Sequence, residues 1–154
     1  MDYFLLKLVH VISATILFGT GLGSAFYMYM ANKTNDIASI YFATRHVVIA
    51  DWVFTTPSVI VQFVTGILLV NLMGYSLTSG WVLWALMLYF FSGICWIPVV
   101  WLQIKMRDMS KLALENNTKL PEKYWNMAFW WTLLGALAFP AVTVIFYLMI
   151  YRPS

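Results

Sequence analysis

Four long runs of apolar residues, separated by short polar stretches, dominate this chain. The runs cover about residues 4–30, 47–72, 81–104 and 127–150. Each exceeds the roughly 20 residues that a helix needs to cross the ~30 Å hydrocarbon core of a bilayer. Because a backbone inside lipid must satisfy its own hydrogen bonds, each run is expected to be a helix. The pattern predicts an all-α, four-helix transmembrane bundle of up-down-up-down topology, with residues 1–154 as a single domain.

The connections between the runs carry their own signals. Asp36 is suited to cap a helix that starts near Ile37, before the apolar part of the second run begins. Residues 73–80 are uncharged, contain two glycines and predict a tight turn. Residues 105–126 hold most of the charge, and their leucines predict a short surface helix before Pro121.

Composition places the protein in lipid. Hydrophobic residues make up 62% and charged residues 10% of the chain, too few charges to solvate the surface of a soluble domain. The net charge of +3 is small and gives no sign of nucleic-acid binding, and the single Cys95 excludes an internal disulfide. We expect the lipid bilayer to be the main partner, with a homo-oligomer or a larger membrane complex as further possibilities.

Basic residues predict the orientation, since cytoplasmic loops of membrane proteins are enriched in lysine and arginine. Two lie with the termini and the second connection, and seven lie on the opposite side. The two are Lys7 and Arg152; the seven are Lys33, Arg45, Lys105, Arg107, Lys111, Lys119 and Lys123. This split predicts that both termini lie on the outer side of the membrane and that the first and third connections face the cytoplasm.

Small and polar residues inside the runs predict helix contacts. Gly19 and Gly23 form a G-x-x-x-G pair, which allows the backbones of two membrane helices to approach closely. Three amides within the spans are expected to bond between helices: Gln62, Asn71 and Gln103. Three prolines fall within spans and are expected to kink them: Pro57, Pro98 and Pro140.

His10 is the first candidate for chemistry, because it lies about two turns inside the first run. Lys7 stands three residues earlier and shares its helix face. A neutral imidazole can ligate a metal through one ring nitrogen, so His10 is a candidate axial ligand of haem iron, with Lys7 near a propionate. The alternative is a histidine that hydrogen-bonds a neighbouring helix while Lys7 extends toward the membrane surface.

A second polar cluster combines Arg45, His46 and Asp51 with Arg107. Asp51 lies about one turn inside the second run and is expected to pair with Arg45 or Arg107. The cluster is either an interfacial salt-bridge network or a clamp for an anion or a cofactor carboxylate. His10 and His46 are not expected to share one iron, because about 27 Å of helix separates His10 from the cytoplasmic end of its span.

Several stretches resemble a bacterial integral-membrane family known as domain of unknown function 2269. They are residues 5–10 followed by 17–21, residues 43–57 and residues 95–108. The resemblance covers nearly the whole chain and implies a four-helix membrane protein without an established activity. The first helix alone, through Lys7, His10 and a downstream glycine, is also similar to haem-containing membrane protoporphyrinogen oxidases and to copper-resistance D membrane proteins.

These observations leave three functional hypotheses. The first is a b-type haem- or porphyrin-binding redox protein that uses His10. The second is a non-catalytic accessory or structural subunit of a larger membrane complex, and the third is a small transporter. The sequence contains no nucleophile–base pair, phosphate-binding loop or metalloprotease motif, so it assigns no enzymatic activity and no substrate.

Overall fold

A computed structural model describes residues 2–78 and 80–153, and these residues form helices and short connections only. The elements are α1 (Tyr3–Thr34), α2 (Ile37–Ala50), η1 (Asp51–Thr55), α3 (Thr56–Leu72), α4 (Gly80–Glu115) and α5 (Glu122–Tyr151). Because η1 is a π-helical segment that joins α2 directly to α3, the three elements form one continuous helix. The described residues therefore form four long helices, each apolar enough to cross a membrane, which confirms the all-α prediction.

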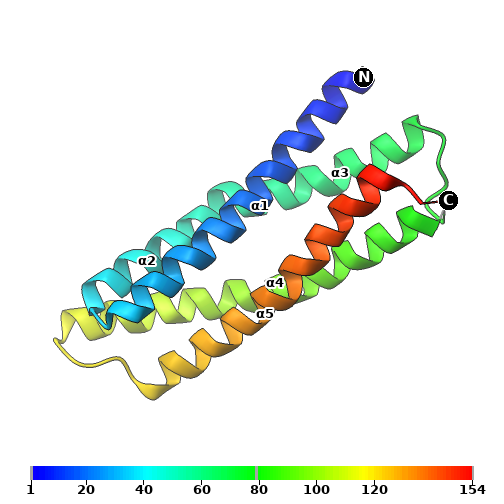
Figure 1. Cartoon of the computed structure of the whole chain (residues 1–154). Helices are drawn as coiled ribbons and strands as arrows, with labels where there is room; N and C mark the ends of the chain where they lie inside the picture. The colour runs from blue at the N-terminus through cyan, green and yellow to red at the C-terminus, as the bar shows by residue number, and fades with distance from the viewer. Residues whose placement is uncertain (1, 79, 154) are drawn as a thin grey trace.

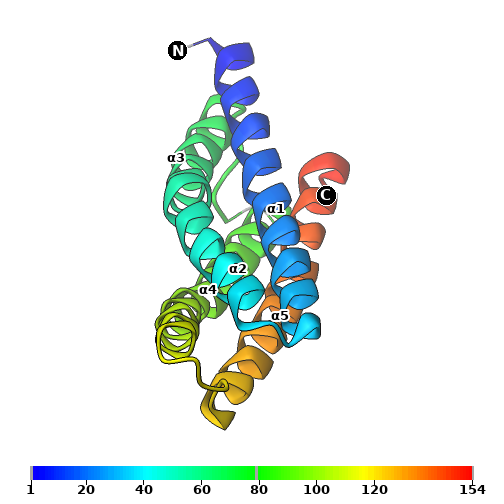
Figure 2. The same cartoon turned by 90° about the vertical axis from the view of Figure 1, so that its left-hand side faces the viewer.

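The four long helices alternate in direction (Figure 1). Both termini and the α3–α4 connection lie at one end, which we call the terminal end. The α1–α2 and α4–α5 connections lie at the other, which we call the basic end because Lys33, Lys111 and Lys119 lie there. Figure 2 shows the same bundle after a quarter turn.

Polar caps define the hairpin between α1 and α2. Asn35 adopts a left-handed φ of 53° and ends α1. The Asp36 carboxylate accepts a hydrogen bond from the backbone amide of Ser39 at 2.8 Å and starts α2. The predicted cap is confirmed, and two residues suffice to reverse the chain.

The prediction of a separate surface helix within residues 105–126 is wrong. Good helix formers continue without a break from the third apolar run, so α4 extends to Glu115 and its last turns take up Leu112 and Leu114. Asn117, with a left-handed φ of 51°, and then Pro121 break the helix.

The π-helical segment η1 has a local cause. Pro57 has no backbone N–H, and its ring collides with the carbonyl group four residues earlier in a regular α-helix. The helical turn before Pro57 contains one extra residue. The Thr56 amide therefore donates to the carbonyl of Asp51, five residues earlier, rather than to the carbonyl four residues earlier. Such π-bulges occur frequently at functional sites, and Asp51 is the first residue of this one.

The hydrophobic core lies toward the basic end. There α1 packs along α2, and α4 packs along both α2 and α5. The side chains of Met28, Ile40, Met106 and Tyr124 are fully buried at this core. Toward the terminal end, α1 packs against α3 and α4 packs against α5, whereas the backbones of α3 and α4 have little contact. The two helix pairs therefore separate in this half of the molecule.

The predicted close contact at Gly19 and Gly23 is wrong. A Cβ atom added at either position would meet no atom within 4 Å outside its own helix backbone. The close approach occurs instead at Gly66 in α3, where an added Cβ would lie 3.4 Å from Cε1 of His10. The imidazole, rather than a neighbouring backbone, occupies the space that a glycine provides.

Candidate functional site

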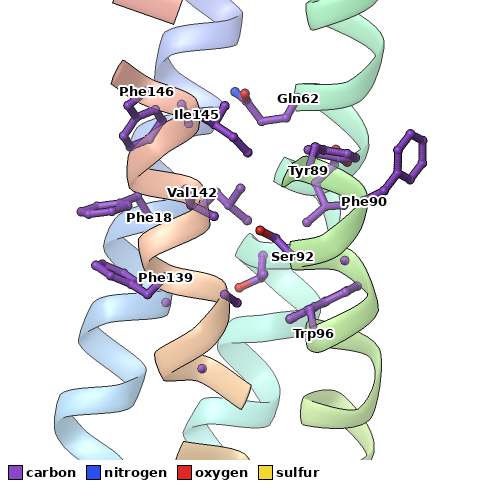
Figure 3. Close-up of a pocket in the computed structure, with 18 of the residues that line it drawn as sticks. Phe18, Gln62, Tyr89, Phe90, Ser92, Trp96, Phe139, Val142, Ile145 and Phe146 are labelled. Carbon is purple, nitrogen blue, oxygen red and sulfur yellow. The ribbon is translucent and has the colours of Figure 1, made fainter. Parts of the chain in front are cut away.

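A cavity of about 520 Å³ lies where the two helix pairs separate. It extends from Asp51, near the middle of the bundle, toward Val70 and Met149 near the terminal end. Figure 3 shows Phe18 and Phe139 beside α1 and α5, with Ser92 and Trp96 on α4 at the opposite wall. The lining is apolar and aromatic apart from a few polar groups, a composition typical of sites for organic ligands.

Asp51 forms the inner, polar end of this cavity. Its side chain is buried, with 6% of the residue exposed. One carboxylate oxygen accepts a hydrogen bond from the Thr55 hydroxyl at 2.7 Å, and the other accepts one from Nε2 of Gln103. Both partners are neutral donors, so hydrogen bonds hold the carboxylate without balancing its charge.

Gln103 has a fixed orientation in this network. Its Oε1 accepts a hydrogen bond from Nε1 of Trp131 at 3.2 Å. Because an indole N–H can only donate, the amide oxygen must face Trp131 and the amide nitrogen must face Asp51. The network therefore connects η1, α4 and α5 and points donors at the carboxylate.

The indole N–H of Trp96 is a buried hydrogen-bond donor without a partner among the described residues. Most buried polar groups in proteins are bonded, and an exception calls for a specific partner or a function. Trp96 also lines the cavity (Figure 3), although its Nε1 atom is closed off from solvent-sized molecules.

His10 belongs to a second polar group, which joins α1 to α3. Its Nδ1 lies 2.7 Å from the Thr65 hydroxyl oxygen, and that oxygen lies 2.6 Å from the Val61 carbonyl. The Gln62 amide donates to the His10 carbonyl and, at 2.6 Å, to the Ser13 hydroxyl. This group occupies the α1–α3 contact beside the cavity, and Gln62 belongs to both.

The Thr65 hydroxyl determines the tautomer of His10. A hydroxyl carries one proton, and the Val61 carbonyl can only accept, so the proton of Thr65 goes to Val61. Thr65 then accepts from Nδ1–H of His10, and Nε2 carries the free lone pair.

A comparison with protein families shows to which family the chain belongs. The family described as "Predicted integral membrane protein (DUF2269)" matches residues 4–153. The chain belongs to this family. No curated protein and no solved structure matches it significantly. Together with the four long apolar helices, membership identifies an integral membrane protein.

In this DUF2269 protein, the second polar cluster does not gather around Asp51. Arg107 pairs with the neighbouring Asp108 at 2.7 Å. His46 is exposed, with its Nδ1 2.7 Å from the Phe42 carbonyl and its ring centre 4.1 Å from that of Phe42, at an interplanar angle of 35°. Arg45 is exposed as well. The predicted pairing of Asp51 with Arg45 or Arg107 is wrong, because the Asp51 carboxylate bonds Thr55 and Gln103 instead.

Lys7 and His10 lie in different surroundings although they share a helix face. His10 is buried, whereas Lys7 is exposed at the terminal end with its Nζ 5.7 Å from the centre of the Tyr3 ring. This placement resembles the alternative in which the lysine extends outward and the histidine bonds a helix.

Sequence reasoning found some of the functional residues of this family member and missed others. Gln62 and Gln103 do bond between helices, as their polarity inside apolar runs predicts. Trp96 and Thr65 were missed, since an indole or a hydroxyl in an apolar helix is compatible with a lipid-facing position. The only available signal was the set of polar residues Asp51, Thr55 and Gln62, which recur on one side of the second span.

Proposed function

We propose that this protein binds a lipid-soluble organic molecule in the cavity between its two helix pairs. The observation that carries the proposal is a mostly apolar cavity of about 520 Å³ that lies between the two helix pairs of a membrane protein. The Trp96 side chain forms part of its wall.

The size and lining of the cavity support an organic ligand. Sites for small organic molecules have volumes of about 300–1,000 Å³ and a mostly apolar lining with a few directed polar groups. The cavity of about 520 Å³ falls within this range. Its directed polar groups are Trp96, Tyr89 and the Asp51–Gln103 network, of which Tyr89 donates to the Val59 carbonyl at 2.8 Å.

A cavity-filling variant tests the proposal. Gly93 lines the cavity one turn from Trp96, and a Cβ there meets no atom within 4 Å, so Gly93→Leu should project into the cavity without a clash. Gly19→Leu is the matched control, because Gly19 is equally open but is exposed and lies outside the lining. Parent and variants are purified in one detergent, and their bound small molecules are extracted and compared by mass spectrometry.

We expect a molecule that co-purifies with the parent and with Gly19→Leu and is depleted at least fivefold in Gly93→Leu. Equal extracts from all three proteins would refute the proposal, since detergent and annular lipid do not distinguish the two positions. Thermal stability of each variant, measured by circular dichroism, shows whether a depleted variant is still folded.

The second candidate is a b-type haem or porphyrin protein with His10 as the axial ligand. The observation in its favour is the tautomer: Nδ1–H donates to Thr65 and leaves the lone pair on Nε2, as in many histidines that ligate metals. Haem would enter beside Gly66, where the imidazole packs against α3. Bound haem would supply one-electron redox chemistry there, and Lys7 lies one turn away for a propionate.

An absorption spectrum of protein expressed with ample haem tests this second candidate. It predicts a Soret band that His10→Ala removes or shifts and that His46→Ala, an exposed site near the basic end, leaves intact. Lys7→Ala should keep the band and weaken haem retention. A colourless protein would refute it, and one that co-purifies in fixed ratio with larger subunits would favour an accessory subunit instead.

We also propose that the protein is a bacterial inner-membrane protein with its termini outside. The orientation rests on the split of lysine and arginine between the two ends, and the bacterial inner membrane, where the termini would be periplasmic, rests on the family resemblance alone. In this orientation the cavity extends toward the outer side of the membrane.

A further inference from the structure

The charge of the cavity lining indicates what kind of molecule it takes. Asp51 is the one charged residue in the lining, and no lysine, arginine or histidine of the described chain lines it. The two described salt bridges, Arg107–Asp108 and Lys111–Glu115, both lie toward the basic end. The cavity therefore offers an anion no counter-charge, and it offers a cation one carboxylate.

Asp51 lies at the depth of the hydrocarbon core. It comes 14 residues, or about 21 Å, after the start of a continuous helix that is about 54 Å long. If a ~30 Å hydrocarbon core is centred on this helix, Asp51 lies about 9 Å inside it. Ionisable groups at such depth face the bundle interior and pair with an opposite charge. The hydrogen bonds from Thr55 and Gln103 provide donors but no positive charge.

Aromatic rings complete the recognition of a cation. Trp131, bonded to Gln103, lines the cavity next to the carboxylate, and Trp96 lines it two turns away on α4, or about 10 Å along the axis. Tryptophan offers the best aromatic face for cation–π attraction, and aromatic cages are a common means of binding quaternary ammonium groups. A cavity whose single charge is a carboxylate and whose wall contains tryptophan rings matches an organic cation better than a neutral or anionic lipid.

We infer that the ligand of this cavity is a lipophilic organic cation, and that Asp51 is its counter-ion. The inference rests on the proposed ligand-binding function and names the chemical class of the ligand. Its positive group lies against the Asp51 carboxylate and Trp131, and its apolar body extends toward the terminal end.

A matched pair of probes tests the inference. Tetraphenylphosphonium and tetraphenylborate have nearly the same shape and opposite charge. Binding of each to the detergent-purified full chain is measured by equilibrium dialysis, for the parent, for Asp51→Asn and for Asp108→Asn. The control Asp108→Asn removes a carboxylate at the basic end that lies outside the cavity. The comparison of variants in one detergent cancels partition of either probe into micelles.

We expect tetraphenylphosphonium to bind the parent and Asp108→Asn, and to bind Asp51→Asn at least tenfold more weakly. Tetraphenylborate should bind the parent at least tenfold more weakly than tetraphenylphosphonium, each measured against protein-free micelles of the same detergent. Since this comparison needs no variant, it tests the inference even if Asp51→Asn fails to fold.

Two results would overturn the inference, and they differ in what they mean for the proposed function. If both probes bind the parent equally, without loss in Asp51→Asn, the cavity does not select charge. If that occurs while Gly93→Leu still depletes a co-purified molecule, ligand binding stands and only the cation assignment fails. If neither probe binds and Gly93→Leu depletes nothing, both proposals fail.

Discussion

Replacing Gln103 by leucine should break the polar network that joins three of the four long helices. The side chain of Gln103 is buried, with 1% of the residue exposed, so water cannot replace its bonds. Leucine has a similar volume and leaves two groups short of a partner. The Asp51 carboxylate loses one of its two donors, and the Trp131 indole loses its acceptor.

The expected cost follows from these two bonds. An orphaned buried polar group costs about 1–3 kcal/mol in soluble proteins, whereas bonds between membrane helices average about 0.6 kcal/mol and reach about 1.7. Two such bonds place the loss in unfolding free energy at about 1–3 kcal/mol. The assay is unfolding by dodecyl sulfate in mixed micelles, followed by far-ultraviolet circular dichroism.

A double-mutant cycle isolates the network from general packing effects. Trp131→Phe removes the donor, so in that background Gln103→Leu breaks only the Asp51 bond and should cost about half as much. Asn71→Leu, at an exposed amide near the end of α3, is the matched control and should have little effect. A Gln103→Leu protein as stable as the parent, with no coupling to Trp131, would refute the network as a source of stability.

Three further predictions follow from the helix contacts and the charge pattern. Gly66→Val should destabilise the protein by about 1–3 kcal/mol in the same assay, because its side chain collides with the His10 imidazole, whereas Gly19→Leu should not; equal stabilities would contradict this. Reporter fusions should place the C-terminus outside and residues 116–121 in the cytoplasm, and a cytoplasmic C-terminus would reverse the orientation. The Ser39 hydroxyl and amide lower the pKa of Asp36, so Asp36→Ala should reduce stability at neutral pH, and this difference should shrink as acid protonates the carboxylate; a difference that persists in acid would rule this out.

Several residues of the candidate site could be predicted from the sequence. His10, Asp51, Gln62 and Gln103 could be selected because polar groups inside apolar runs are costly and need partners. Their partners could not be selected, since a run that is apolar on all sides does not show which face meets which helix. The pairing of His10 with Thr65 and of Asp51 with Gln103 joins residues 55 and 52 positions apart.

The sequence by itself determined the number of long helices, their alternating direction and the hairpin cap at Asp36. These features follow from the length of apolar runs, from the backbone's need for internal hydrogen bonds in lipid and from local turn chemistry. Each is a property of adjacent residues, so no knowledge of the packing is needed.

Only the tertiary structure decided where helices touch and where they separate. Gly19 and Gly23 satisfied a contact motif but face open space, while Gly66, which belongs to no motif, accommodates His10. Asp51 bonds Gln103 of α4 rather than either arginine, and it lines a cavity. Which side chain of a distant helix meets Asp51 is set by how the helices pack, and the order of hydrophobic and polar positions does not contain that information.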